Sequence, residues 1–399
     1  MPLRLNSIRT QILLALLLTS LLPLLLIGGY ALQTSSGQLR QHAIEQSKSN
    51  LSLVNQQIQM FFQGVQGDLF YLRDSNDVGL YLAALKQGDE ATTKLMLNNL
   101  RNSFRQFSQN RGIYDQVRIM DMQGMEIVRI SLEDGKAVII SEDKLLNKMN
   151  RYFVTESLKQ PEGGLYISPM DLKEKSPGVL EDPPRPSIRY GTSLWDKDKT
   201  QQGMVLFNTL GNGVVDLVKN AQTEGQTLLF VSPEGFYYYN PDPAKAWGGP
   251  NDLKTGINLF TDYPELKERL GSTDAPASFQ MGDKFISTLP VKLNNDQHLV
   301  GTLISVAAND VVFAPVKSSF WQYLSMGVLI LLLSGLVALW LSRRITQPLD
   351  QLASEVERLS LGETDKPVNV PAYDKTQELS AAVERLRKSL NILSRRMNK

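Results

Sequence analysis

The sequence contains two long stretches without a charged residue, QILLALLLTSLLPLLLIGGYAL at residues 11–32 and WQYLSMGVLILLLSGLVALWL at residues 321–341. A helix needs about 20 apolar residues to cross a bilayer, and both stretches meet that length. Trp321, Tyr323 and Trp340 lie close to the ends of the second stretch, where amphipathic rings prefer the headgroup boundary. We therefore expect two transmembrane helices, with the chain between them on one side of a membrane.

Basic residues flank the outer end of both stretches. Arg4 and Arg9 precede the first stretch, and Arg343 and Arg344 follow the second. Because cytoplasmic flanks carry an excess of Lys and Arg, both chain ends are expected in the cytoplasm. Residues 33–318 are then periplasmic or extracellular.

Two other interpretations of the apolar stretches compete with this one. A cleaved signal peptide is the first, because Gly29-Tyr30-Ala31 resembles a small-x-small cleavage site. The apolar run from Ile12 to Ile27 exceeds the usual signal core of about 7–15 residues, which favours an uncleaved anchor. The second is a buried helix hairpin of a soluble protein, which two charge-free runs with basic flanks disfavour.

Composition excludes several classes of protein. The 42 basic and 41 acidic residues leave a formal charge of +1, which gives no support to nucleic-acid binding. The chain has no cysteine, so disulfides, thiolate metal sites and cysteine nucleophiles are excluded. Its two histidines, His42 and His298, are far apart, which argues against a histidine metal site or a hydrolase triad. We expect no metal and no cofactor.

The region between the stretches begins with helical periodicity. Apolar residues recur at steps of three and four over residues 33–72, which predicts one long helix. They are Leu51, Val54, Ile58, Phe61, Val65, Leu69 and Leu72. A further helix is expected around Leu95, Leu97, Leu100, Phe104 and Phe107.

Strand patterns follow, and they occur twice. QVRIMDMQGMEIVRIS (116–131) and TLLFVSPEGFYYYNPD (227–242) each read as a hairpin around a glycine-containing turn. Residues 187–218 and 285–316 each read as a strand, a polar turn and a second, apolar strand. The second strand begins at Gly203 in the first segment and at Gly301 in the other. Any antiparallel sheet yields hairpins, but the matching order favours a duplication. The sequence predicts an α+β region of two tandem modules, with the distal module at about 75–220 and the proximal at about 221–315.

This plan resembles the double Cache domain of bacterial receptors, in which a long helix precedes two PAS-like modules between two spans. Three segments closely resemble the membrane-distal module of one Cache subfamily found on sensor kinases and related receptors: MDMQGMEIVRIS (120–131), GLYISPMDL (164–172) and PPRPSIRYGTSLWDKDKTQQGMVLFN (183–208). The resemblance covers about residues 35–315. It implies an inner (plasma) membrane receptor of a bacterium that binds a small molecule outside the cytoplasm.

In that family the distal module holds a small carboxylate, amino acid or amine. An arginine can clamp a carboxylate, a tyrosine offers a flat wall with a polar tip, and an aspartate favours an amine. The alternative is that these side chains only pack or cap turns. The candidates for ligand binding are Arg129, Tyr152, Tyr166, Asp171, Arg189 and Tyr190.

Heptad spacing returns after the second stretch. Apolar residues step four and three along SRRITQPLDQLASEVERLSLGE (342–363), and again along the closing helix that begins near Glu378. Between the two helices, TDKPVNVPAYDKTQ (364–377) contains two prolines and cannot continue the first helix. The first seam contains Ile345, Leu349, Leu352, Val356 and Leu359; the second contains Leu379, Val383, Leu386, Leu390, Leu393 and Met397.

This arrangement resembles the HAMP domain, a parallel four-helix bundle formed by a dimer, over residues 342–394. Pro348 stands in the R-x-x-x-P-L position of that family, and Asp374 with Glu378 and Leu379 matches the acidic start of its second helix, where Lys375 replaces a glutamate. The resemblance implies a homodimer. It also implies that signals pass through Pro348, Leu352, Val356, Asp374, Glu378 and Leu379.

The expected function is that of a membrane receptor with no enzyme of its own. No cytoplasmic histidine and no glycine-rich phosphate loop is present to support a kinase. The output would come from a separate kinase, cyclase or chemoreceptor protein, in chemotaxis or a two-component system. The chain stops five residues beyond the expected HAMP domain, so it is either a complete sensory subunit or a truncated receptor. A periplasmic hydrolase and an envelope adaptor are the rival classes.

The expected organisation is a cytoplasmic N-terminus (1–10), first span (11–32), sensor region (33–318), second span (321–341), HAMP domain (342–394) and tail (395–399).

Overall fold

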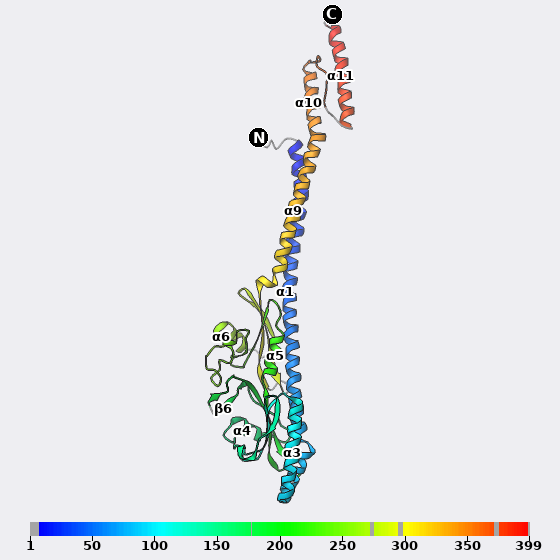
Figure 1. The fold of residues 1–399 in the computed structure, drawn as a ribbon. Helices are drawn as coiled ribbons and strands as arrows, with labels where there is room; N and C mark the ends of the chain where they lie inside the picture. Colours follow the sequence, from blue (N-terminus) through cyan, green and yellow to red (C-terminus); the bar gives the residue numbers. More distant parts are fainter. Residues whose placement is uncertain (1–7, 177, 272–274, 294–297, 371–374, 398–399) are drawn as a thin grey trace. The chain divides into compact units, whose positions relative to one another are not determined.

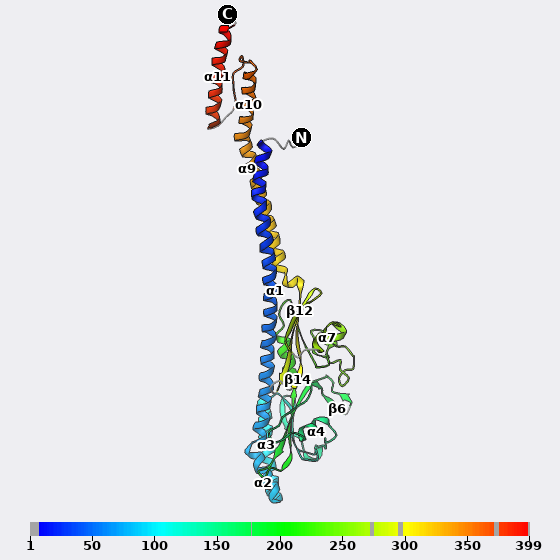
Figure 2. The same cartoon turned by 180° about the vertical axis from the view of Figure 1, so that it is seen from behind.

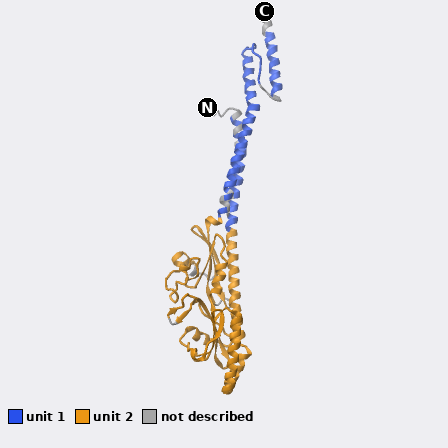
Figure 3. Ribbon diagram, in the orientation of Figure 1, with its two compact units in different colours: residues 1–40, 313–399 blue, residues 41–312 orange. Residues whose placement is uncertain are grey.

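The computed structural model describes residues 8–176, 178–271, 275–293, 298–370 and 375–397. The chain divides into two compact units (Figure 3). One contains residues 41–312, and the other contains residues 1–40 together with residues 313–399.

The predicted long helix is present as part of α1 (Ile8–Arg73), which also contains the first apolar stretch. Within residues 41–312, α1 runs along both sheets of the unit (Figures 1 and 2). Six of its seven predicted core positions are buried. The exception is Phe61, which is partly buried, while Phe62 is 2% exposed and its ring lies 5.8 Å from that of Tyr190. The sheet fixes which of these two neighbouring rings turns inward.

The first module contains a seven-stranded antiparallel sheet of order β3-β2-β1-β9-β8-β4, in which β5 also pairs with β8. Helices α1 and α3 contribute to its core on one face, and α4 packs on β8 and β9 from the other (Figure 1). A short ribbon of β6 and β7 lies apart from this sheet. The elements are α2 (Asn76–Gln87), α3 (Glu90–Arg111), β1 (Tyr114–Met120), β2 (Glu126–Glu133), β3 (Lys136–Ile139), η1 (Glu142–Lys144), α4 (Tyr152–Leu158), β4 (Tyr166–Ile167), β5 (Asp171–Leu172), β6 (Glu174–Ser176), β7 (Val179–Leu180), β8 (Pro186–Trp195) and β9 (Gln201–Leu210).

The second module contains a five-stranded antiparallel sheet of order β11-β10-β14-β13-β12. Helix α5 packs against β10 and β11, much as α3 precedes and covers β1 and β2. The elements are α5 (Asn212–Asn220), β10 (Gln226–Val231), β11 (Tyr237–Tyr239), η2 (Pro243–Lys245), α6 (Leu259–Asp262), α7 (Leu266–Gly271), β12 (Ala277–Met281), β13 (Lys284–Leu293), β14 (His298–Ala308) and α8 (Asn309–Val312).

The two sheets confirm the predicted duplication. In each, the first hairpin (β1–β2 or β10–β11) joins the second hairpin (β8–β9 or β13–β14) through the same pairing of inner strands. Even the glycines correspond. A Cβ on Gly203 would overlap the carbonyl oxygen of Met120 at the end of β1, and one on Gly301 would overlap that of Val231 at the end of β10. Only glycine lets the two inner strands approach so closely at this point.

Alanine at either glycine should therefore be costly. Gly203→Ala and Gly301→Ala are each expected to lower the free energy of unfolding by about 3 kcal/mol, since the contacting atoms are backbone and cannot move aside. Gly67→Ala is the control, because nothing lies within 4 Å of its added Cβ and alanine favours a helix by about 1 kcal/mol. Thermal unfolding followed by tryptophan fluorescence measures all three. Equal melting temperatures would contradict the duplicated close approach.

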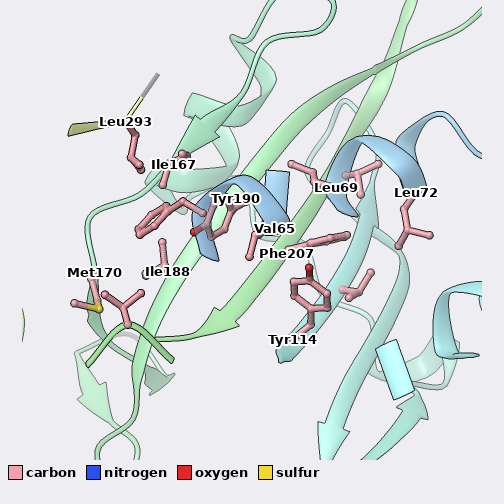
Figure 4. Packing of buried hydrophobic residues seen from close by; sticks show 14 of the residues in the cluster. Val65, Leu69, Leu72, Tyr114, Ile167, Met170, Ile188, Tyr190, Phe207 and Leu293 are labelled. Atoms are coloured by element: carbon pink, nitrogen blue, oxygen red, sulfur yellow. The ribbon is translucent and has the colours of Figure 1, made fainter. Parts of the chain in front are cut away.

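Aromatic and branched side chains fill the core of the first module (Figure 4). Tyr114 and Phe207 come from the paired strands β1 and β9, and their ring centroids lie 4.7 Å apart. Val65 and Leu69 of α1 are fully buried in the same cluster, as Figure 4 shows. Because successive side chains on a strand point to opposite faces, the residues that face this core also determine which residues lie on the opposite face of the sheet.

The other unit contains the two candidate membrane spans. The first lies in α1, and the second lies in α9 (Ala314–Leu341), which covers the predicted residues 321–341. Within this unit the hydroxyls of Ser20 and Ser334 are hydrogen-bonded at 2.9 Å. No break separates α9 from the next helix: a π-helical turn (Ser342–Thr346) leads directly into α10 (Gln347–Ser360).

Helices α10 and α11 (Lys375–Met397) enclose a small apolar cluster with the segment that connects them. Its members are Leu352, Leu359, Val368 and Val383. Glu384 of α11 holds the connecting segment against the helix, because its carboxylate accepts a hydrogen bond from the backbone N–H of Val368 at 2.8 Å. Hydrogen bonds from Arg387 and from this N–H lower the pKa of Glu384 to about 2, so its carboxylate is charged under all physiological conditions.

Candidate functional site

A cavity of about 670 Å³ lies where the two modules meet. We call it the inter-module pocket. The first module contributes residues 150–152 at the start of α4, residues 169–172, Glu174 and Arg189. The second contributes Ser232, Glu234 and residues 236–238 of the β10–β11 hairpin, and residues 249–252 of the following loop.

Arg189 is the most deeply buried charged group of the pocket. It lies on β8, is 4% exposed, and its Nη1 is 2.5 Å from Oδ1 of Asp171. Its guanidinium lies over the ring of Phe153, 5.1 Å from the centroid. The backbone N–H of Arg189 donates to Oγ of Ser168 at 2.9 Å, which holds the strand carrying Asp171 beside β8. The charge of Asp171 holds the pKa of Arg189 above its usual value despite the burial that opposes it.

Tyr152 closes the same corner from α4. Its hydroxyl donates to Oδ2 of Asp171 at 3.0 Å, and burial raises the pKa of the phenol. Helix α4 lies close to β8 because Gly191 has no side chain: a Cβ there would overlap Ser157. A second ion pair lies nearby, between Arg151 and Glu174 at 2.8 Å. Both arginines of the pocket therefore have a carboxylate partner.

Asp252 links the second module to the first. Its Oδ1 accepts the backbone N–H of Leu172 at 2.9 Å, so the loop of one module is hydrogen-bonded to β5 of the other. Within the described ranges, neither Asp252 nor Glu234 forms an ion pair. Burial, with a smaller contribution from the charge of Asp171, raises the pKa of Asp252 to about 6.

The six side chains expected at a ligand site divide into two groups. Tyr152, Asp171 and Arg189 line the pocket and contact one another. Tyr190 faces the opposite way, because neighbours on a strand alternate, and it is completely buried in the core (Figure 4). Tyr166 packs beside α4 and Arg129 lies in a separate ion cluster, both outside the pocket lining.

That ion cluster is buried under the first sheet. Glu126 has a fully buried side chain, with Oε1 3.2 Å from Nε of Arg118 and Oε2 2.9 Å from Nη1 of Arg129. The backbone N–H of Leu146 donates to the same carboxylate at 3.1 Å. Burial lowers the pKa of Arg118 to about 10, in spite of Glu126. One carboxylate thus balances two guanidinium groups.

The residues expected to relay a signal lie on α10 and α11. Pro348 and Leu352 are buried in the single chain, whereas Val356 and Leu379 are 44% and 48% exposed. Glu378 is exposed, and Asp374 lies outside the described residues.

Several pocket residues were missed by the sequence analysis. Glu234 and the tyrosines at 237–238 lie in the predicted hairpin at 227–242, where they gave no sign of a ligand site, and Asp252 lies in a segment to which no element was assigned. Arg151 and Glu174 lie outside the three segments that carry the resemblance to the Cache family, and no helix or strand periodicity marked them. Within the ranges that the structure describes, no three His, Asp or Glu side chains gather as a metal site would require.

A family model described as bacterial histidine kinase, sensor domain, matches residues 79–300. The comparison with curated proteins finds no match. Among solved structures, the extracellular domain of a protein described as the histidine kinase vpHK1S-Z8 superposes with a TM-score of 0.55 at 20% identity, over 71% of this chain and 96% of that one.

Two further structures share the fold. A domain described as belonging to a sensory box/GGDEF family protein from Vibrio parahaemolyticus has a TM-score of 0.54 at 20% identity, covering 69% of this chain and 98% of its own. The ligand-binding domain of the Campylobacter jejuni chemoreceptor Tlp3, in complex with L-valine, has a TM-score of 0.50 at 13% identity, covering 69% and 97%. At these identities the likeness concerns the fold: a long helix with two sheet modules of the extracellular sensor type.

Proposed function

The chain belongs to the family of bacterial histidine kinase sensor domains, and on that premise we propose that it is a two-pass receptor of the bacterial inner membrane. Residues 33–318 lie outside the cytoplasm in this proposal, and a small molecule binds in the inter-module pocket. Two candidate membrane-spanning helices flank the sensor domain in the sequence, which supports its location on one side of the membrane. The basic residues at the outer ends of both stretches support the orientation. The chain acts by binding and has no catalytic activity of its own.

The observation that carries the proposal is the composition of the pocket. It is a concave space of ordinary ligand size with a few convergent polar groups and a carboxylate of perturbed pKa, the usual features of a binding site. Its walls come from both modules, joined by the hydrogen bond from Leu172 to Asp252. A ligand that contacts both walls favours one relative packing of the modules over another. A coupling of about 1–3 kcal/mol is typical of such shifts.

We further propose that residues 342–394 act as a HAMP domain in a homodimer. The cluster around Leu352 and Val383 supports a paired-helix unit. Other seam residues remain exposed in the single chain, and a second copy packed in parallel would bury them. They are Val356 (44% exposed), Leu379 (48%), Leu386 (53%), Leu390 (36%) and Leu393 (55%). The bundle would pass its change of packing to a separate kinase, cyclase or chemoreceptor output protein.

The ligand-binding step is tested on the intact chain in lipid nanodiscs. A thermal-shift screen of amino acids, organic acids and amines should yield a compound that raises the melting temperature by mass action. Tyr152→Phe removes the hydroxyl that donates to Asp171, and we expect it to weaken binding about tenfold. Tyr166→Phe is the matched control, because that ring lies outside the pocket lining, and it should bind as the wild type does. Equal losses in both variants would place the ligand elsewhere.

A further inference from the structure

We infer, on the basis of the proposed sensing function, that the ligand of the inter-module pocket is a small organic cation whose ammonium group lies between Asp252 and the aromatic wall. This assignment is supported by the charge balance of the pocket, by the surroundings of Asp252 and by the rings that line the cavity.

The charged lining of the pocket is unbalanced. Two arginines face four carboxylates there, and each arginine is already committed: Arg189 to Asp171 at 2.5 Å, and Arg151 to Glu174 at 2.8 Å. The remaining carboxylates, Glu234 and Asp252, lack an ion-pair partner among the described residues. An anionic ligand would have to displace Asp171 from a buried arginine. A cation would find two negative charges without a partner.

Asp252 is the better placed of these two carboxylates. It is half-buried, whereas Glu234 is exposed to solvent. Its Oδ1 accepts the N–H of Leu172, and no hydrogen bond or ion pair to its Oδ2 is found within the described part of the chain. Burial raises the pKa of Asp252 to about 6, which reflects the cost of holding an unpaired charge there. An ammonium group at Oδ2 would remove that cost.

Aromatic rings complete the site. Tyr152, Phe236 and Tyr238 all line the pocket. Burial and the nearby charges of Glu234, Asp252 and Asp171 raise the pKa of Tyr238, so three carboxylates act on this one phenol. Aromatic faces attract ammonium groups, and the effect is larger when water is excluded. Carboxylates and rings that line one pocket suit an organic cation better than an acid or a neutral sugar.

A pH dependence follows from this geometry. The groups that face Asp252 across the pocket are Asp171, Glu174, Arg151, Arg189, Glu234, Tyr152 and Tyr238. Because the raised pKa keeps Asp252 protonated below about pH 6, cation binding should be strongest above that pH. It should weaken as the pH falls from about 7 to 5. Near pH 6, binding should release a proton.

The test uses isothermal titration calorimetry on the intact chain in nanodiscs, with butylammonium, 1,4-diaminobutane and tetramethylammonium as probes. We expect at least one probe to bind at pH 7.5, with an affinity that falls about tenfold at pH 5. Asp252→Asn keeps the acceptor for Leu172 but removes the charge, and it should lower that affinity at least tenfold. Asp216→Asn, at an exposed position on α5, is the control and should leave it unchanged.

A second measurement does not depend on the choice of probe. Without ligand, Asp252→Asn should melt a few degrees above the wild type at pH 7.5 and equal to it near pH 4, because only the charged carboxylate is unfavourable there. The inference is overturned if no probe binds up to about 100 mM. It is also overturned if a probe binds equally well to Asp252→Asn. If the screen instead yields an acid or a neutral compound whose binding depends on Tyr152, the pocket has the proposed sensing function, but its ligand is not a cation.

Discussion

Replacing Glu126 with glutamine is expected to lower the free energy of unfolding by about 3–5 kcal/mol, a large share of the stability of any domain. The side chain of Glu126 is fully buried, and it is the ion-pair partner of both Arg118 and Arg129 within the described residues. Glutamine has the same size but keeps only one of the two acceptor oxygens, so the variant loses the charge and one acceptor without leaving a cavity. Arg118 and Arg129 would both lose the ion-pair partner that they share.

The control for this variant is Glu142→Gln. Glu142 pairs with Arg101 at 2.7 Å, but its side chain is 68% exposed and water screens the pair. We expect its melting temperature to match that of the wild type. Thermal unfolding of the intact chain, followed by tryptophan fluorescence, gives both values. If the two variants melt together, the buried cluster does not stabilise the first module as its geometry implies.

The second large effect is expected from Leu352→Ala in the helix pair. Leu352 is 3% exposed and packs with Leu359, Val368 and Val383. Removing a buried leucine costs about 2–5 kcal/mol, and a cluster this small has little stability to lose. We expect α10 and α11 to separate and the output to fail, while the sensor domain still binds its ligand.

Hydrogen exchange of the backbone amides in α10 and α11 measures the loss of pairing directly. Leu361→Ala is the matched control, because that leucine is 77% exposed and should leave the exchange rates unchanged. Equal exchange rates in the two variants would mean that the cluster does not hold the helices together. Complete loss of ligand binding in Leu352→Ala would contradict a role of this residue in relay alone.

Local sequence patterns predicted most of the sensor fold. The hairpins at 116–131 and 227–242 were recognised because their turns depend on nearby residues. Gly203 and Gly301 were recognised only as the residues that begin a strand, because their close approach to Met120 and Val231 joins residues far apart in the sequence. The seam of α1 was predicted in the same way, apart from Phe61. Two adjacent phenylalanines fit the period equally well, and only the contact of Phe62 with Tyr190 decides between them.

The pocket was less predictable, for two physical reasons. Arg189 and Tyr190 were both candidates, yet neighbours on a strand face opposite sides, and which face is the core depends on the whole sheet. Asp252 was missed because it meets Leu172 across 80 positions of sequence, through the packing of two modules. A single sequence carries no signal for such a contact.

The central claim is that ligand in the inter-module pocket changes the packing of the helix pair between two copies of the chain. Because the chain has no cysteine, Leu386→Cys can carry a single spin label at a seam position that is 53% exposed. Pulsed electron paramagnetic resonance in nanodiscs then measures the label-to-label distance with and without the ligand found in the thermal-shift screen. We predict a defined distance between two copies that shifts on ligand addition and no longer shifts in Tyr152→Phe. The absence of any inter-copy distance, or a distribution that saturating ligand leaves unchanged, would contradict the account.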